Sequence, residues 1–177
     1  MHKEFWDQFP KPIIGLAPME GYSDSAFRQL CKIINPTLIT YTEFTSADGL
    51  NYGAQRIISK LAYDPSEQPI IAQIFGKNTE SFINAAKWCW IDASDLLDFC
   101  RGAQAAGANM LAIHGRTYKE PYNVPAQFES IYELKSQISI PVLINGGITD
   151  ISDGVTKVKH LDGFLIGQAA FGNPWVF

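Results

Sequence analysis

Short apolar runs alternate with longer amphipathic segments along this chain, and each apolar run ends at a glycine, a proline or a polar residue. Within a run, apolar residues do not alternate with polar ones, so both faces of each strand should be covered, as in a parallel sheet flanked by helices. Strands that alternate with helices are typical of parallel βαβ units. The pattern predicts six strands, at residues 12–17, 37–43, 69–75, 109–114, 140–145 and 163–166.

Helical spacing of apolar residues separates these strands. Ser23 or Asp24 can cap a first helix that ends at Asn35-Pro36, and its apolar side chains should share one buried face. The residues on that face are Phe27, Leu30, Cys31 and Ile34. A shorter helix follows the polar stretch 46–53, and further helices are predicted at about 79–89, 92–106, 129–137 and 153–160.

The alternation fails at one place. No strand lies between the helices predicted at 79–89 and 92–106. A TIM barrel has eight strands and usually about 250 residues, with about 200 as its lower limit. An added strand-helix-strand unit would restore both the alternation and the count of eight. We therefore expect one domain, residues 1–177, that is an incomplete TIM-type (β/α)8 barrel, without its fourth and fifth strands and with a deletion junction near 88–91.

Composition narrows the class of protein. The chain has 177 residues, of which 46% are hydrophobic, and a net charge of −4, so it has no general attraction for polyanions. Cys31, Cys89 and Cys100 show neither metal-ligand nor redox spacing, which favours reduced thiols, a cytoplasmic location and no metal site. No apolar run approaches the roughly twenty residues that span a bilayer, so no membrane association is expected.

The candidate functional residues follow the carboxyl ends of the predicted strands, where βα-barrel enzymes place their chemistry. Glycine-rich corners after the last two strands suit a phosphate, because backbone N–H groups are left uncovered there. These corners are Asn145-Gly146-Gly147 and Gly167-Gln168. The other candidates are Pro18, Met19 and Glu20 after the first strand, Glu43 after the second, Gln73 in the third, and His114 with Arg116 after the fourth recognisable strand.

Each candidate also has a structural interpretation. Gln73 interrupts an apolar run, and its amide needs a partner, which could be a ligand or a neighbouring backbone carbonyl. His114 could be a satisfied structural histidine, and Asn145-Gly146-Gly147 an ordinary turn. Glu43 and Arg116 could form a solvated ion pair. Their common position at strand ends favours the functional interpretation.

Several of these residues lie in motifs that resemble those of the tRNA-dihydrouridine synthases. The motifs occur in the family's order over nearly the whole chain. They are APMEGYSD at 17–24 with Phe27-Arg28, Thr42-Glu43, QIFG at 73–76, HGRT at 114–117, NGG at 145–147 and GQAAFGNPW at 167–175.

This resemblance implies an FMN-bound barrel that reduces the 5,6 double bond of selected uridines in tRNA, with NADPH as reductant. It implies that Pro18, Met19 and Glu20 lie at the flavin, that Gln73 bonds the ring edge, and that His114 contacts the cofactor near the uracil. Glu43 and Arg116 are tentative substrate contacts. The FMN phosphate would be held by Asn145, Gly146, Gly147, Gly167 and Gln168.

Four departures from the family pattern bear on activity. The family's proton-donating cysteine, in an Asn-x-Gly-Cys-Pro motif, and its fifth-strand lysine are both absent, and both belong to the segment inferred to be missing. Gln168 stands where the family usually has arginine, and we expect this chain to lack the family's C-terminal helical domain. The missing cysteine argues against catalysis by this chain, so no catalytic residue is assigned. The alternatives are a non-catalytic remnant that binds FMN, RNA or a sister chain through open sheet edges, and another FMN barrel acting on a small molecule.

Overall fold

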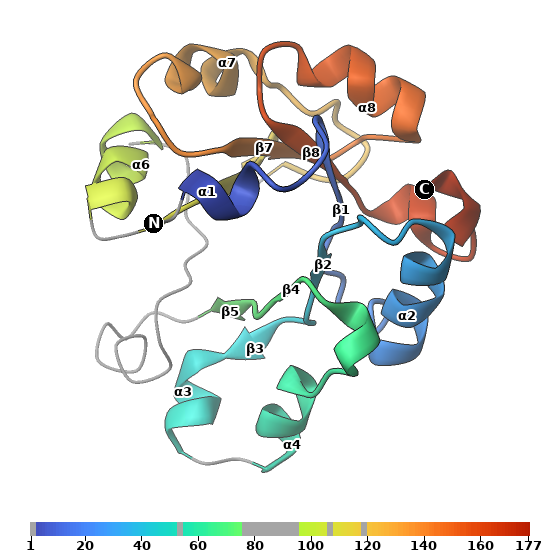
Figure 1. Cartoon of the computed structure of the whole chain (residues 1–177). Coiled ribbons are helices and arrows are strands. Elements are labelled where there is room, and N and C mark those ends of the chain that lie inside the picture. The colour runs from blue at the N-terminus through green and yellow to red at the C-terminus, as the bar shows by residue number, and fades with distance from the viewer. Residues whose placement is uncertain (1–2, 53–54, 76–95, 106–107, 118–119) are drawn as a thin grey trace. The chain divides into compact units, whose positions relative to one another are not determined.

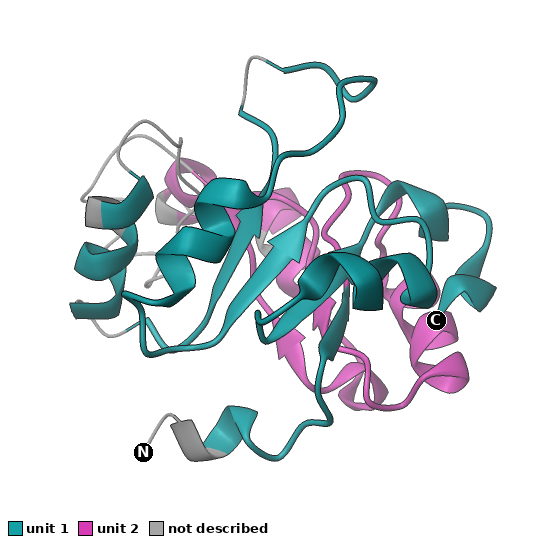
Figure 2. Ribbon diagram, turned by 90° about the horizontal axis from the view of Figure 1, so that it is seen from above, with its two compact units in different colours: residues 1–15, 91–177 teal, residues 16–90 magenta. Residues whose placement is uncertain are grey.

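The computed structural model describes residues 3–52, 55–75, 96–105, 108–117 and 120–177. The chain divides into two compact units, one made of residues 1–15 with 91–177 and the other of residues 16–90 (Figure 2). Each unit is built from parallel strands joined through helices. They are called unit 1 and unit 2 below.

Unit 1 contains a four-stranded sheet with the order β1-β8-β7-β6. Its strands are β1 (Ile13–Leu16), β6 (Leu111–His114), β7 (Val142–Asn145) and β8 (Gly163–Ile166). The β6–β7 and β7–β8 pairs are parallel, with His114 opposite Asn145 and Asn145 opposite Leu165. The last strand lies beside the first, where Ile13 N donates to Asp162 O at 2.8 Å. In a βα barrel, pairing of the last strand with the first strand closes the sheet.

Helices cover this sheet. They are α1 (Lys3–Trp6), α6 (Leu96–Ala105), α7 (Glu129–Lys135) and α8 (Ile151–Val158), and the short 3-10 turns η4 (Gln168–Ala170) and η5 (Pro174–Val176) follow β8. Figure 1 shows α7 and α8 on the same side of β7 and β8. The core beneath them is apolar, and the apolar residues that β7 and β8 contribute to it are fully or almost fully buried. Gly154 of α8 permits the close approach, since a Cβ there would lie 2.3 Å from the Phe164 ring.

Unit 2 contains two short parallel pairs, β2 (Thr40–Tyr41) with β4 (Ile70–Ile71) and β3 (Thr45–Ser46) with β5 (Ile74–Phe75). Its helices are α2 (Ser25–Ile34), α3 (Ala47–Asn51) and α4 (Gln55–Ile58), with the 3-10 turns η1 (Ser59–Leu61) and η2 (Pro65–Glu67).

A β-bulge in the second predicted strand interrupts its pairing with the third predicted strand. Tyr41 pairs with Ile71, an offset of thirty residues, whereas Thr45 pairs with Ile74, an offset of twenty-nine. The second strand therefore carries one extra residue between these two pairs. The continuous strands predicted at 37–43 and 69–75 are wrong in extent for this reason. Bulges are common beside active sites because they turn side chains in new directions.

The helix α2 begins where the sequence predicts, because the Asp24 carboxylate accepts a hydrogen bond from Phe27 N at 2.9 Å. The predicted apolar face is partly wrong, since Leu30 is 42% exposed. Two cations, Arg28 and Lys32, are buried instead. Lys32 Nζ donates to Pro36 O at 2.7 Å and to Leu38 O at 3.0 Å, so its charge is satisfied by backbone carbonyls.

Other boundaries differ from the predictions by a few residues. β6 begins at Leu111, α7 ends at Lys135, and α8 begins at Ile151 because Asp150 caps it. Helix α1 was not predicted. The helix predicted at 79–89 and the thiol of Cys89 lie outside the described residues. Cys31 and Cys100 are buried free thiols, and burial raises the pKa of each to about 11. Among the described residues, no helix is long and apolar enough to cross a bilayer.

Candidate cofactor site

The corner after β7, residues 145–147, is called the phosphate turn. Gly146 has φ +106° and Gly147 has φ +64°, both in the region that glycine alone occupies easily. A Cβ on Gly146 would lie 2.7 Å from His114 Cε1, so the imidazole ring lies directly against the backbone of the turn. The sequence prediction of a turn that is open to close approach is therefore supported by both its dihedral angles and its contacts.

His114 is held in one orientation by the residue two positions later. Its Nδ1 accepts a hydrogen bond from Arg116 N at 3.1 Å, so the proton of the neutral ring is on Nε2. Burial, followed by the nearby Arg116 charge, lowers the pKa of His114 below its ordinary value. The ring is therefore neutral at pH 7, and it can donate a hydrogen bond without carrying a charge.

We expect the free energy of unfolding to fall as the pH falls from about 6.5, because the unfolded chain takes up a proton on His114 before the folded chain does. This contribution to the free energy of unfolding is fully present above the ordinary pKa of His114, and it is lost as the pH falls towards the lowered pKa of the folded chain. The free energy of unfolding changes by at most about 1.4 kcal/mol per pH unit in this range. Urea unfolding between pH 5 and 7 measures this slope. His114→Gln should flatten this slope, and an unchanged slope in the variant would contradict the assignment to His114.

Two cations lie at the phosphate turn. Arg116 Nη2 would be 3.3 Å from a Cβ on Gly147, and Arg116 Nε donates to Val124 O at 2.5 Å. Lys157 Nζ donates to Gly147 O at 2.8 Å and to Asp153 Oδ2 at 2.7 Å. The sequence analysis did not identify Lys157, although its spacing of four from Asp153 indicates a helix-surface pair.

Gly167 and Gln168 follow β8, the neighbour of β7 in the sheet. Their strand is parallel to β7, so both corners lie at the carboxyl edge of the same sheet. Gly167 O accepts a hydrogen bond from Ala170 N at 2.8 Å, which begins the 3-10 turn η4 at Gln168. The structure thus brings together the two corners that the sequence predicts as a phosphate site.

In unit 2, the turn after β1 at residues 18–23 is held from several sides, and is called the first turn. Met19 N donates to Ser23 Oγ at 2.8 Å, and Ser23 Oγ donates back to Met19 O at 3.0 Å. Glu20 forms an ion pair with Lys60. Gly21, at φ +76°, donates its N–H to Glu43 Oε1 at 2.6 Å. The predicted residues Pro18, Met19 and Glu20 therefore lie in a fixed loop.

Glu43 thus has a structural contact, while its contact with substrate stays a prediction. The bulge in the second strand lies at this position. Glu43 accepts a hydrogen bond from Gly21 N within unit 2, and Arg116 Nε donates to Val124 O within unit 1, so the solvated pair of Glu43 with Arg116 stays an alternative prediction.

A buried ion pair that the sequence analysis missed supports the first turn. Arg28 Nε donates to Glu67 Oε2 at 2.5 Å, and the two side chains are 2% and 0% exposed. Arg28 Nη1 also donates to Ser23 O at 2.7 Å. Glu67 accepts further hydrogen bonds from Ser25 Oγ and from Asp64 N. A capping box, in which Asp64 precedes Glu67 by three residues, is the sequence signal that could have found it.

Gln73 has a buried amide oxygen with no partner. Its backbone N–H donates to Thr42 Oγ1 at 2.9 Å, but Oε1 accepts no hydrogen bond from the described residues. Leaving a buried acceptor unsatisfied costs about 1–3 kcal/mol, so a ligand N–H would be favoured at this position. This contact is the one that the resemblance assigns to a flavin ring edge.

Comparison with known families identifies the chain. The family described as Dihydrouridine synthase (Dus) matches residues 15–90 and 87–177. The chain belongs to the dihydrouridine synthase family. The resemblance stated from the motifs is thereby confirmed. The two matches meet at residues 87–90, at the predicted deletion junction.

Relatives of this dihydrouridine synthase family member include proteins named as tRNA-dihydrouridine synthases. A probable tRNA-dihydrouridine synthase of Aquifex aeolicus is 28% identical, over 96% of this chain and 72% of its own. Probable tRNA-dihydrouridine synthase 2 of Bacillus subtilis is 25% identical, over 100% of this chain and 74% of its own. The latter alignment has 242 positions and this chain has 177 residues, so about 65 positions have no residue from this chain.

A solved structure shows the fold of this dihydrouridine synthase family member. A FabK mutant from Thermotoga maritima has 15% identity and a TM-score of 0.58, over 93% of this chain and 63% of that one. At this identity the likeness concerns the fold alone. Together with the parallel sheet in which β8 lies beside β1, it confirms an incomplete TIM-type barrel.

Residues of this dihydrouridine synthase family member fit a flavin nucleotide at two places. The phosphate turn has two positive-φ glycines beside the guanidinium of Arg116, which suits an anion, and Lys157, which is paired with Asp153, donates to the Gly147 carbonyl. Gln73 Oε1 is a buried acceptor that no described residue satisfies, as a ring N–H requires. The phosphate turn belongs to unit 1 and Gln73 to unit 2, so each was compared with the flavin nucleotide separately.

Proposed function

We propose that this chain binds FMN and derives from an enzyme that reduces uridine to 5,6-dihydrouridine in tRNA with NADPH. The observation that carries the proposal is the phosphate turn, in which Gly146 is packed against His114 and Gly147 lies beside Arg116. The relatives' names supply the tRNA substrate. We propose a cytoplasmic location, which that substrate and the free thiols of Cys31 and Cys100 support.

The protein's part in this reaction is to place and polarise the reactants. When bound, FMN supplies the hydride that adds to the uracil ring. The backbone N–H groups of residues 145–147 and 167–168, with Arg116 and Lys157, would hold its phosphate. Gln73 would accept from the ring, Pro18, Met19 and Glu20 would border it, and neutral His114 would donate through Nε2. Glu43 and Arg116 remain the proposed substrate contacts.

We further propose that about 65 residues are missing internally, at a junction within residues 87–91. A barrel of about 250 residues has about thirty per βα unit, so 65 residues correspond to two units. The two family matches, which overlap at residues 87–90, support this position. The two units would be those of the fourth and fifth strands.

The missing segment has a chemical consequence. Hydride addition at C6 of uracil places charge at C5, which must then receive a proton from a positioned acid. The family's cysteine motif for that step is absent from this sequence. General acid catalysis is typically worth about 10² to 10⁴ in rate. We therefore propose that this chain alone does not complete the reaction at a useful rate.

A second candidate is a non-catalytic remnant that associates with another copy. The order β1-β8-β7-β6 leaves β6 with one neighbour within the described sheet of unit 1, and an unpaired edge can pair with another chain. A sedimentation measurement over a range of concentrations tests this association. A monomer at every concentration would exclude it.

The proposed function is tested by restoring the missing segment. The Bacillus subtilis segment that aligns with the gap is inserted between Trp88 and Ile91, and both proteins are expressed in bacteria without dihydrouridine synthases. Mass spectrometry of tRNA nucleosides should detect dihydrouridine with the chimera and not with the chain alone. A chimera whose inserted cysteine is replaced by alanine is the matched control.

Two results would contradict this account. Dihydrouridine formation by the chain alone would show that the missing cysteine is not required. A chimera that is soluble and binds FMN, yet forms no dihydrouridine, would show that the remaining residues do not belong to a uridine-reducing site.

A further inference from the structure

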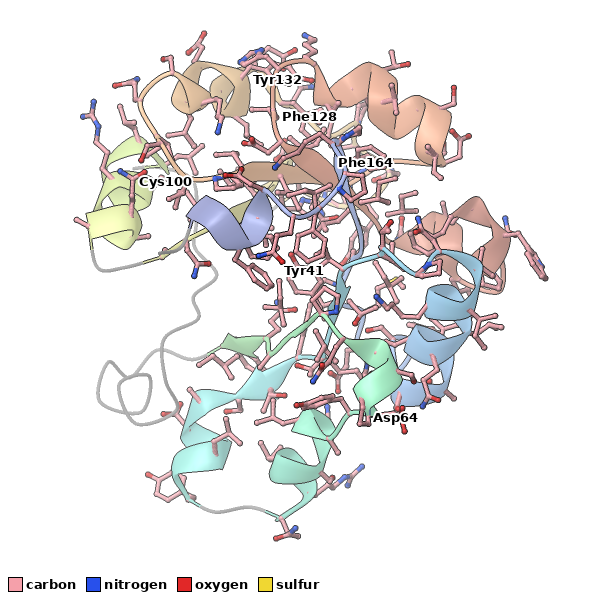
Figure 3. All side chains as sticks on the ribbon, viewed as in Figure 1. Tyr41, Asp64, Cys100, Phe128, Tyr132 and Phe164 are labelled. Carbon is pink, nitrogen blue, oxygen red and sulfur yellow. The ribbon has the colours of Figure 1, made fainter. Side chains whose placement is uncertain are left out.

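Unit 2 contains a second buried polar atom without a partner. Tyr41 lies at the end of β2 (Figure 3), and its side chain is 6% exposed. Its hydroxyl and the amide oxygen of Gln73 are the buried side-chain atoms, among the described residues, that make no hydrogen bond. Buried polar atoms normally find a partner, so the Tyr41 hydroxyl at the end of β2 and the Gln73 amide oxygen between β4 and β5 need an explanation.

The strand register places both side chains on one face. Tyr41 is paired with Ile71 in the parallel β2–β4 ladder, so these two point to the same side. Ile71 O and Gln73 O both accept hydrogen bonds from the second strand, from Thr42 N and Thr45 N, so the third strand stays extended between them. Residues two apart in an extended strand share a face, which puts Gln73 diagonally beside Tyr41.

The two groups have complementary chemistry. The Oε1 atom of Gln73 can only accept, whereas a phenol can donate. Burial raises the pKa of Tyr41, so its hydroxyl keeps its proton at every physiological pH. This makes Tyr41 a hydrogen-bond donor rather than a proton donor in a reaction. The pair therefore offers one acceptor and one donor, and the two do not satisfy each other.

We propose that Tyr41 and Gln73 together bind the imide edge of a pyrimidine ring, with Gln73 accepting from the ring N–H and Tyr41 donating to an adjacent ring carbonyl. Two rings in the proposed function carry this edge, the pyrimidine portion of FMN and the uracil of the substrate. The inference thus rests on the proposed function and adds Tyr41 to its site.

Tyr41→Phe tests the proposal, because it removes the hydroxyl and keeps the ring. Without ligand, the variant should melt a few degrees higher, since a buried group without a partner is gone. With ligand, its dissociation constant should rise about three- to tenfold, as expected for one lost hydrogen bond. The probes are FMN, followed by fluorescence, and uridine monophosphate, followed by calorimetry. Tyr63→Phe, at a half-exposed tyrosine, is the matched control and should change neither quantity.

The two ligands distinguish the source of the ring. Weaker binding of FMN alone assigns the edge to the flavin, and weaker binding of uridine monophosphate alone assigns it to the substrate. If wild type binds FMN and Tyr41→Phe weakens neither ligand, the inference is wrong while the proposed function stands. If wild type binds uridine monophosphate through Tyr41 but not FMN, the proposed cofactor is wrong while the inference stands. Binding of neither ligand by wild type overturns both.

Discussion

Replacing Arg28 by methionine is expected to lower the free energy of unfolding by about 3–5 kcal/mol. The change leaves the carboxylate of Glu67 fully buried with its cation removed. It also frees the carbonyls of Ser23 and Ala62, which accept from Arg28 Nη1 and Nη2 at 2.7 and 3.2 Å. Urea unfolding followed by circular dichroism measures the loss. Because Ser23 holds Met19, the first turn should also become susceptible to proteolysis.

Two controls separate the buried charge from other effects. Arg28→Met combined with Glu67→Leu removes both charges and should recover most of the loss, since a buried pair can often be replaced by apolar residues. Lys60→Met breaks the more exposed pair with Glu20 and should cost no more than about 1 kcal/mol. Equal losses in Arg28→Met and Lys60→Met would contradict the assignment of a buried, structurally required pair.

Gly146→Ala is expected to have the largest effect on cofactor binding. The new methyl group would lie 2.7 Å from His114 Cε1, and the residue has φ +106°. An unfavourable backbone conformation costs about 1–3 kcal/mol, and overpacking costs about the same again. Relief of the contact must move either the His114 ring or the phosphate turn. We expect the affinity for FMN to fall at least about tenfold, measured by quenching of flavin fluorescence.

Gly21→Ala is the matched control for the backbone effect. Gly21 also has a positive φ, +76°, but a Cβ there would meet nothing within 4 Å. Gly21→Ala should therefore lose stability through the unfavourable backbone conformation alone, without a steric clash. If both alanine variants weaken FMN binding equally, the contact between Gly146 and His114 is not what shapes the phosphate turn.

The sequence predicted the elements of unit 1 well because their signals are local. Apolar residues in β7 and β8 are continuous, and glycine-rich corners follow them, so both strands and the phosphate turn were found. In unit 2, the local signals of Asp24 and Asn35-Pro36 correctly predicted the two ends of α2. The break in strand-helix alternation predicted a deletion junction near residues 88–91, and the two family matches overlap at residues 87–90.

The remaining features depend on contacts between distant residues. The bulge in the second strand is a property of its register with the third, which no single segment encodes. The apolar face predicted for α2 did not include Arg28 and Lys32, and only Glu67 and the carbonyls after the helix explain their burial. Tyr41 looked like an ordinary strand residue, because its unsatisfied hydroxyl becomes visible only when every neighbouring polar group has been placed.

The central claim, that the phosphate turn holds a flavin nucleotide by its phosphate, is tested by comparing FMN with riboflavin, which lacks the phosphate. Both are titrated into the purified chain and followed by flavin fluorescence. We predict that FMN binds at least about tenfold more tightly than riboflavin, and that Gly146→Ala removes most of this preference. Equal affinity for the two flavins, or no binding of either, would contradict the claim.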